Sequence, residues 1–119
     1  MYAYEIPNMR FSLPAGGAVA RHRFVSVASD KAIQATAATE VIGASMNLVT
    51  TEELAAGERI VEIADGIVMV EAAGAITSGV AVYADAAGKA TATKGTAAAI
   101  AGIAITAAKT AGDLVAVKI

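Results

Sequence analysis

Few side chains in this 119-residue chain could do catalytic chemistry, and His22 is the first of them. It is the only histidine and lies between Arg21 and Arg23, in a segment with the alternation of a strand. A histidine that acts as a general base needs a nucleophile to deprotonate and an acid to orient its ring, and no motif supplies either. We therefore expect an exposed or subunit-contact histidine, no catalytic residue and no enzyme.

The sequence also contains few residues that could bind a metal ion or a phosphate group. The glutamates Glu52, Glu53 and Glu58 surround one loop and could bind a hard cation, but the alternating oxygen ligands of a calcium loop are missing. The chain has no cysteine, which excludes disulfides and thiolate zinc sites. In "GAITSGVA", Val80 stands where a phosphate-binding loop requires lysine. We expect no metal and no cofactor.

Two lysines on predicted turns leave one chemical alternative open. Lys31 lies in "SDKA", and Lys89 lies at the matching turn of a second, similar segment. Lipoyl and biotinyl carrier domains resemble this pattern, since they are small β structures that present one lysine on a tight turn. An ordinary charged hairpin turn is the simpler interpretation, because a carrier domain leaves the final 30 residues and the N-terminal segment unexplained.

The composition limits the size of the core that could support any such site, and it limits the classes of partner. Alanine supplies 31 residues and Val, Ile and Leu together only 27, with five aromatics, so the core must be thin and association should add stability. The longest uncharged run, from Gly95 to Ala108, has 14 residues, too few for a membrane-spanning helix of about 20. A net charge of −2 argues against a nucleic-acid partner.

A duplication at an offset of about 57 residues organises the chain. The segment "GAVARHRFVSVASDKAIQAT" aligns with "GAITSGVAVYADAAGKATAT", so that Val19 matches Ile76 and Val25 matches Val82. Further on, Gly43 matches Gly102. We predict a single duplicated domain over residues 15–119, with halves at about 15–64 and 72–119.

Each half is expected to contain three short strands. In the second half the apolar pattern steps by two, which predicts strands at 80–84, 99–106 and 114–119, and a further strand over 65–71 joins the halves. One helical turn is predicted at "TTEELAAG", where Thr50 and Glu53 form a capping box and Gly57 ends the helix. Regularly spaced short strands predict an all-β fold, a small antiparallel barrel or sandwich built from two similar halves.

Residues 1–14 are predicted to be an extended N-terminal arm in front of the duplication. The arm contains three of the five aromatics, Tyr2, Tyr4 and Phe11, and both prolines, Pro7 and Pro14. Prolines and alternating aromatics suit an extended segment that docks onto another surface. We expect residues 1–13 to become ordered only against such a surface; a terminal strand of its own domain is the alternative.

The duplicated segments resemble a known family. The order "GVAVYADAAGK" followed by "AGIAITAAKTAGDLVAVKI" is similar to phage head-decoration, or capsid cement, proteins. Gly79, Val82, Tyr83, Asp85, Gly88 and Lys89 fit the first part of the family pattern, and Ala101–Ala104, Gly112-Asp113 and Val115–Ile119 fit the second. The resemblance covers residues 15–119 and leaves the arm outside.

The resemblance implies a structural virion protein on the outer surface of the capsid of a double-stranded DNA phage. It implies the major capsid protein as a partner and self-association, with a homotrimer favoured over a dimer; no membrane partner is implied. Another phage structural role, in a tail or as a minor head protein, is the alternative. Combined with the arm, it predicts capsid or subunit contacts at Tyr2, Tyr4, Ile6, Met9, Arg10 and Phe11.

Overall fold

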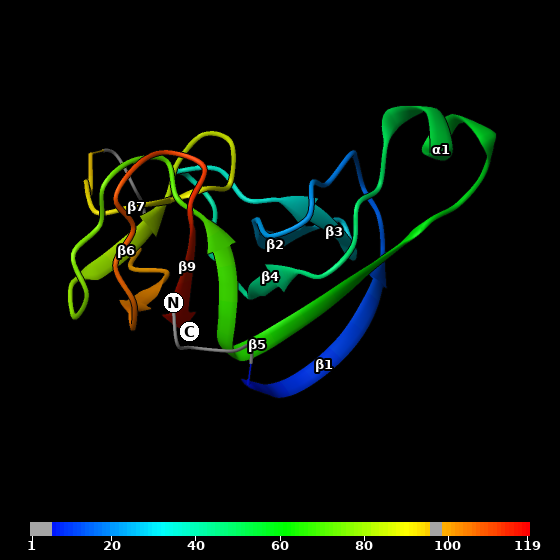
Figure 1. Ribbon diagram of the computed structural model, residues 1–119. Helices are drawn as coiled ribbons and strands as arrows, with labels where there is room; N and C mark the ends of the chain where they lie inside the picture. The colour runs from blue at the N-terminus through cyan, green and yellow to red at the C-terminus, as the bar shows by residue number, and fades with distance from the viewer. Residues whose placement is uncertain (1–5, 96–98) are drawn as a thin grey trace.

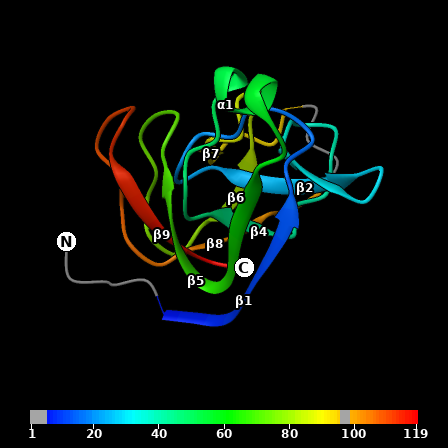
Figure 2. The same cartoon turned by 90° about the vertical axis from the view of Figure 1, so that its right-hand side faces the viewer.

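The computed structural model describes residues 6–95 and 99–119, and for residues 6–8 the backbone alone. Figure 1 shows a sheet protein with one short helix, as the all-β prediction requires. The strands are β1 (Ile6–Pro14), β2 (Phe24–Ala28), β3 (Lys31–Gln34), β4 (Gly43–Ser45), β5 (Ile60–Glu71), β6 (Ala81–Ala84), β7 (Ala90–Thr91), β8 (Gly102–Ala104) and β9 (Leu114–Lys118), and the helix is α1 (Thr51–Ala56). All strand pairs are antiparallel, and the sheet curls into a half-barrel (Figure 2).

The strand order makes β5 the centre of the sheet. The order is β3-β2-β4-β5-β9-β8-β6-β7, with β1 added to β5. The first part of β5 pairs with β1 and β4, and its last five residues pair with β9. This double use explains why β5 begins at Ile60 and not at the predicted Asp65.

The other predicted elements differ in length. The strand predicted at 99–106 is reduced to β8, because it pairs with β6 only at Gly102 and Ile103. The two-residue β7, opposite Tyr83 and Ala84, was not predicted. The helix forms with its predicted capping box: the Glu53 backbone N–H donates to Thr50 Oγ1 at 3.1 Å, and Glu53 Oε1 accepts from the Thr50 N–H.

The same hydrogen bonds recur in both halves. Val19 and Val49 exchange backbone hydrogen bonds of 3.0 and 2.8 Å, and Ile76 and Ala108 exchange two of 2.9 Å. The Gly16 N–H donates to Ala32 O at 2.7 Å, and the Ala73 N–H donates to Ala90 O at 2.8 Å. The division into two halves stays a proposal, and this correspondence supports it.

The correspondence extends into the predicted arm. β1 pairs with β5 through Phe11 opposite Ile63 and Leu13 opposite Val61. Val68 and Val70 of β5 match Phe11 and Leu13 at the offset of 57 residues. They pair with β9 in the corresponding way, Val68 opposite Val117 and Val70 opposite Val115. We therefore propose that the repeated units begin at Ile6 and at Ile63, so that β1 is the first strand of the first unit.

The backbone of β1 also corrects one expectation. Residues 6–14 pair with β5 of their own chain, so the prediction that they become ordered only against another molecule is wrong. Tyr2 and Tyr4 lie outside the described residues. The physical reason is that β5 offers a long strand edge whose backbone groups need partners, and β1 supplies them.

Two apolar clusters form the core. One contains Val19, Val25, Val61 and Ile63 of the first half. The other consists mostly of second-half residues, but it includes Phe24 from β2. The turn before β7 reaches toward Phe24, since the Phe24 N–H donates to Gly88 O at 2.8 Å. The halves therefore interlock.

Two glycines at matching positions allow strands to approach closely. A Cβ at Gly43 would lie 2.6 Å from Ala64 O, and a Cβ at Gly102 would lie 2.5 Å from Lys118 O. Contacts this short are not made by real side chains, so both positions require glycine. The sequence match between Gly43 and Gly102 thus has a shared steric cause.

Candidate contact surface

The predicted contact residues that the structure describes lie on β1, at the margin of the sheet. Met9 is 56% exposed and Arg10 is exposed, whereas Phe11 is half-buried. For Ile6 the backbone position in β1 is described, opposite Ile67. The structure thus gathers Ile6, Met9, Arg10 and Phe11 on one strand, and it leaves Tyr2 and Tyr4 undescribed.

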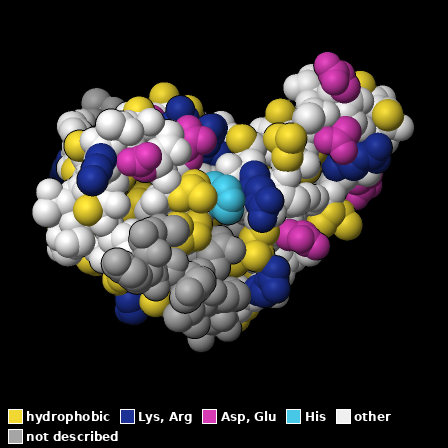
Figure 3. All heavy atoms as spheres, viewed as in Figure 1, with side chains coloured by type: hydrophobic (Ala, Val, Ile, Leu, Met, Phe, Trp, Pro, Cys, Tyr) yellow, Lys and Arg dark blue, Asp and Glu magenta, His cyan; other side chains and the backbone are white. Residues whose placement is uncertain are grey.

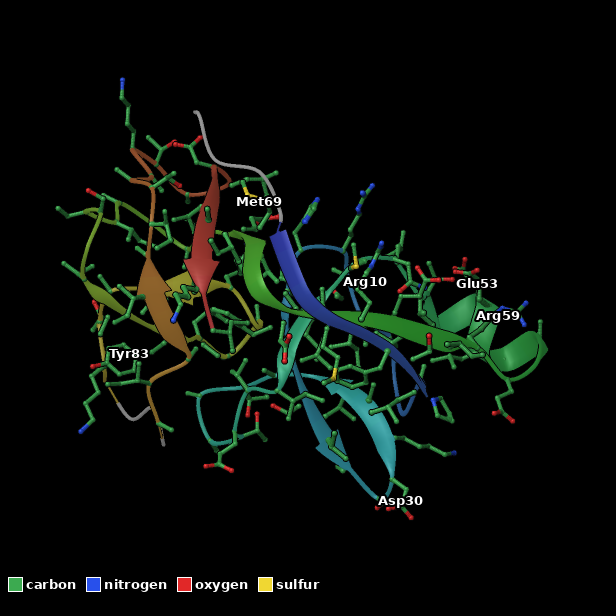
Figure 4. All side chains as sticks on the ribbon, turned by 90° about the horizontal axis from the view of Figure 1, so that it is seen from below. Arg10, Asp30, Glu53, Arg59, Met69 and Tyr83 are labelled. Carbon is green, nitrogen blue, oxygen red and sulfur yellow. The ribbon has the colours of Figure 1, made fainter. Side chains whose placement is uncertain are left out.

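The two faces of β1 have different roles. Phe11 and Leu13 pack against the core cluster of the first half. On the opposite face, Arg10 Nη2 donates to Met46 Sδ at 3.2 Å, and Arg10 projects from β1 in Figure 4. A shallow hollow of about 290 Å³ lies beside this contact, lined by Arg10, Phe11, Ser12, Met46, Glu62 and Ile63.

His22 lies at the surface between the two halves (Figure 3, cyan). Its backbone has a φ of 59°, and its counterpart Gly79 has a φ of 85°. Its carbonyl accepts from the Glu71 N–H at 2.9 Å, and Nδ1 lies 3.3 Å from Met69 O. These contacts give His22 a structural role at the junction.

An ion cluster lies nearby, and the sequence did not reveal it. Glu71 Oε1 pairs with Arg23 Nη2 at 3.2 Å, and Glu71 Oε2 pairs with Lys89 Nζ at 3.0 Å. The Lys89 ammonium, followed by the Arg23 guanidinium, holds the pKa of Glu71 below its ordinary value in spite of partial desolvation. The signal that could have found it is one acid at the end of the apolar strand "IVMV".

The acidic loop is part of the helix and its flanks. Hydrogen bonds from Thr50 lower the pKa of Glu53, whose Oε2 also lies 3.9 Å from Arg59 Nε; Figure 4 shows both residues at α1. Within residues 6–95 and 99–119, no three acids or histidines gather closely enough to hold a metal ion. In the same residues, no helix has the length and apolar character needed to cross a bilayer.

The turn lysines differ in environment. Lys89 is engaged with Glu71, and the turn before it is closed by Asp85, whose Oδ1 accepts from the Ala87 and Lys89 N–H groups at 2.9 Å. Lys31 is exposed at the start of β3, after a turn with positive φ at Ser29 and Asp30. The hairpin-turn interpretation accounts for both positions.

The fold defines a class: a small antiparallel β protein with a curled sheet, in which β1 supplies a strand edge. The model of the phage cement protein family matches residues 5–119, so the chain belongs to this family. The match begins at residue 5 and therefore includes β1, which the resemblance had left out. No curated protein sequence matches the chain.

One solved structure is similar over almost the whole chain. It is the N base of head fiber gp8.5 in bacteriophage phi29, with a TM-score of 0.65 and 18% sequence identity. The alignment covers 93% of this chain and 94% of that chain. At this identity the likeness shows a shared fold. The family membership makes the chain a phage structural protein associated with the capsid.

Proposed function

We propose that the protein binds the outer surface of the capsid of a double-stranded DNA phage and stabilises the shell, without catalysis. The observation that carries this proposal is the match of the phage cement protein family to residues 5–119. The major capsid protein is the proposed partner. The proposed self-association is a homotrimer in preference to a dimer.

The proposed mechanism is binding without turnover. A protein that bridges neighbouring capsid subunits adds its contact free energy to the assembled state and none to the separated subunits, which raises the stability of the shell. The proposed contacts with the capsid or a neighbouring subunit are Tyr2, Tyr4, Ile6, Met9, Arg10 and Phe11. The exposed Met9 and Arg10 support this choice.

Another phage structural role is the second candidate, because the fold is shared with a head fiber base. The two roles differ in their position on the particle. A shell protein covers the capsid in many copies, whereas a tail or minor head protein is present in few. A carrier domain modified at Lys31 or Lys89 has less support, since Lys89 is held by Glu71.

The test compares virions with and without the protein. Electron microscopy of purified particles should show the protein over the outer shell, and stripped particles should release DNA at a lower temperature than decorated ones. Mass spectrometry should find no covalent addition on lysine. Equal heat resistance of stripped and decorated heads would refute the stabilising role, and few copies at one vertex would favour a minor head component.

A further inference from the structure

The outer edge of β1 carries backbone groups that point away from the sheet. The Ala15 N–H donates to Arg59 O at 2.8 Å, which marks these two residues as a hydrogen-bonded pair. Hydrogen-bonded and non-hydrogen-bonded pairs alternate along an antiparallel ladder. The backbone groups of Leu13 and Phe11 therefore face β5, and those of Ser12 and Arg10 face outward.

The matching edge on β5 is covered. The positions on β5 that match three residues of β1 have partners. These are Ile67, Met69 and Glu71, which match Arg10, Ser12 and Pro14. Ile67 pairs with Ile6, Met69 O lies 3.3 Å from His22 Nδ1, and the Glu71 N–H donates to His22 O at 2.9 Å. In the described part of the chain, no such partners reach the outward backbone groups of Arg10 and Ser12.

Two features bound the open edge. Pro14 holds the position on β1 that matches Glu71 on β5, whose N–H donates to His22 O. Because proline has no backbone N–H, no donor is left unpaired at this position. From Ala15 onward the edge is closed, because Ala15 forms a parallel bridge with Ala32 of β3. Between these limits, Arg10 and Ser12 offer four outward groups, the N–H and C=O of each.

We propose that this edge pairs with the same edge of a second copy, antiparallel and centred on Phe11. Arg10 then lies opposite Ser12 of the second copy, and the reverse, so all four groups on each strand are hydrogen-bonded. Phe11 faces Phe11 of the second copy as a non-hydrogen-bonded pair, in which side chains come closest. The 56% exposed Met9 lies opposite Leu13 of the second copy, and the contact covers the half-exposed apolar face.

The charges favour this register. A register centred on Arg10 would place two arginines opposite each other, which is unfavourable. Centred on Phe11, Arg10 faces the small Ser12 of the second copy, and Glu62 of the second copy lies next along the row, since Ser12 and Glu62 are paired within each chain. Two strand spacings amount to about 10 Å, a span that extended Arg and Glu side chains can bridge.

This contact rests on the self-association proposed above and adds a second kind of contact to it. It is isologous, so it joins copies two by two. It is a different contact from a threefold one, and in trimers it joins one trimer to the next. Because the experiments use the isolated protein, their failure leaves the capsid role to be judged on virions alone.

The first experiment removes the outward donor. Of the backbone hydrogen-bonding groups, Ser12→Pro deletes only the Ser12 N–H, which faces away from β5, and proline is tolerated at such edge positions. Light scattering should give the full chain a mass of at least twice 11.8 kDa, and Ser12→Pro should halve that mass at equal concentration. Ser12→Ala, which keeps the N–H, should behave like the unmodified chain. A monomeric full chain, or an unchanged mass for a Ser12→Pro variant with the native circular dichroism spectrum, would overturn the pairing.

The second experiment does not depend on a proline. Because the chain contains no cysteine, Phe11→Cys introduces a single thiol whose counterpart in the second copy lies at disulfide distance. Oxidation should convert most of this variant to a covalent dimer. Leu48→Cys, at an apolar side chain 57% exposed elsewhere, is the matched control and should remain monomeric on a denaturing gel. Equal cross-linking of the two variants would reject the proposed edge contact.

A charge exchange tests the register. Arg10→Glu places a glutamate beside Glu62 of the second copy and should weaken association by roughly tenfold, about 1.4 kcal/mol. Adding Glu62→Arg should restore it. Failure of the double variant to recover would exclude this register.

Discussion

At the scale of single residues, Glu71 is the residue with the most consequential contacts. It lies at the end of the central strand and binds Arg23, which precedes β2, and Lys89, which precedes β7. One carboxylate therefore holds together segments from both halves. The sequence could not reveal this cluster, because Arg23 and Glu71 are 48 positions apart and only the curl of the sheet brings them together.

We predict that Glu71→Gln lowers the free energy of unfolding by about 1 kcal/mol at pH 7. The pKa of Glu71 is lower in the folded state than its ordinary value of 4.5, so its contribution is fully present above that pH and is lost as the pH falls through the folded-state pKa. Denaturant unfolding of both proteins between pH 7 and pH 3 measures the difference, which should shrink below about pH 4.5. Glu40→Gln, at an exposed glutamate without an ion pair to any described residue, is the control. A deficit that stays constant down to pH 3 would contradict the prediction.

At the scale of elements, the repeated pattern predicted the strands better than their ends. The step of two at Val115 and Val117 reflects a real strand, β9. The lengths of β5 and β8 depend on which neighbours lie alongside, and a single sequence does not contain that information. The aromatics and prolines of residues 1–14 indicate an extended segment, and the pairing of β1 with β5 agrees with the alternative of a terminal strand of its own domain. The partner strand could not be predicted, because nothing in the composition of residues 6–14 specifies β5.

We predict that Gly43→Ala and Gly102→Ala each destabilise the protein by about 1–3 kcal/mol, since the new Cβ would collide with a backbone carbonyl of the neighbouring strand. Gly74→Ala is the matched control: no atom lies within 4 Å of its added Cβ. Thermal unfolding of the three variants provides the comparison. If the control lost as much stability as the other two, the steric explanation would be wrong.

The helix should behave as a locally stable unit. Thr50→Ala removes the capping hydrogen bond, which is worth about 0.5–2 kcal/mol to a helix. Because α1 contains no buried residue, we predict faster amide exchange over residues 51–57 with an unchanged melting temperature. A fall in melting temperature would mean that the helix contributes to the global fold.

At the scale of the whole molecule, the two proposed halves are not independent of each other. The strand β5 serves both of them, and Phe24 of the first half is buried in the second core cluster. The largest fully buried side chain of a thin core thus crosses the boundary between the halves.

We therefore predict that a fragment of residues 63–119 does not fold alone, although it contains one complete unit of the proposed repeat. It lacks Phe24, the pairing of β1 with β5 and the His22 contacts. Circular dichroism should show a disordered spectrum for it, and mixing with residues 1–62 should recover part of the sheet signal. A cooperative melting transition for 63–119 by itself would show that the halves are autonomous.

The two outer neighbours of Ile67 have a mechanical consequence. Ile6, the first residue of β1, lies on one side of Ile67, and Lys118, the last residue of β9, lies on the other, so the start of β1 and the end of β9 are about 10 Å apart across β5. Tension applied between the chain ends would peel β1 and β9 from β5 one hydrogen bond at a time, whereas a load along the strands would strain many bonds at once. The sheet therefore resists a force on the two chain ends poorly. A contact that has to carry mechanical force is better made through the faces and edges of the sheet.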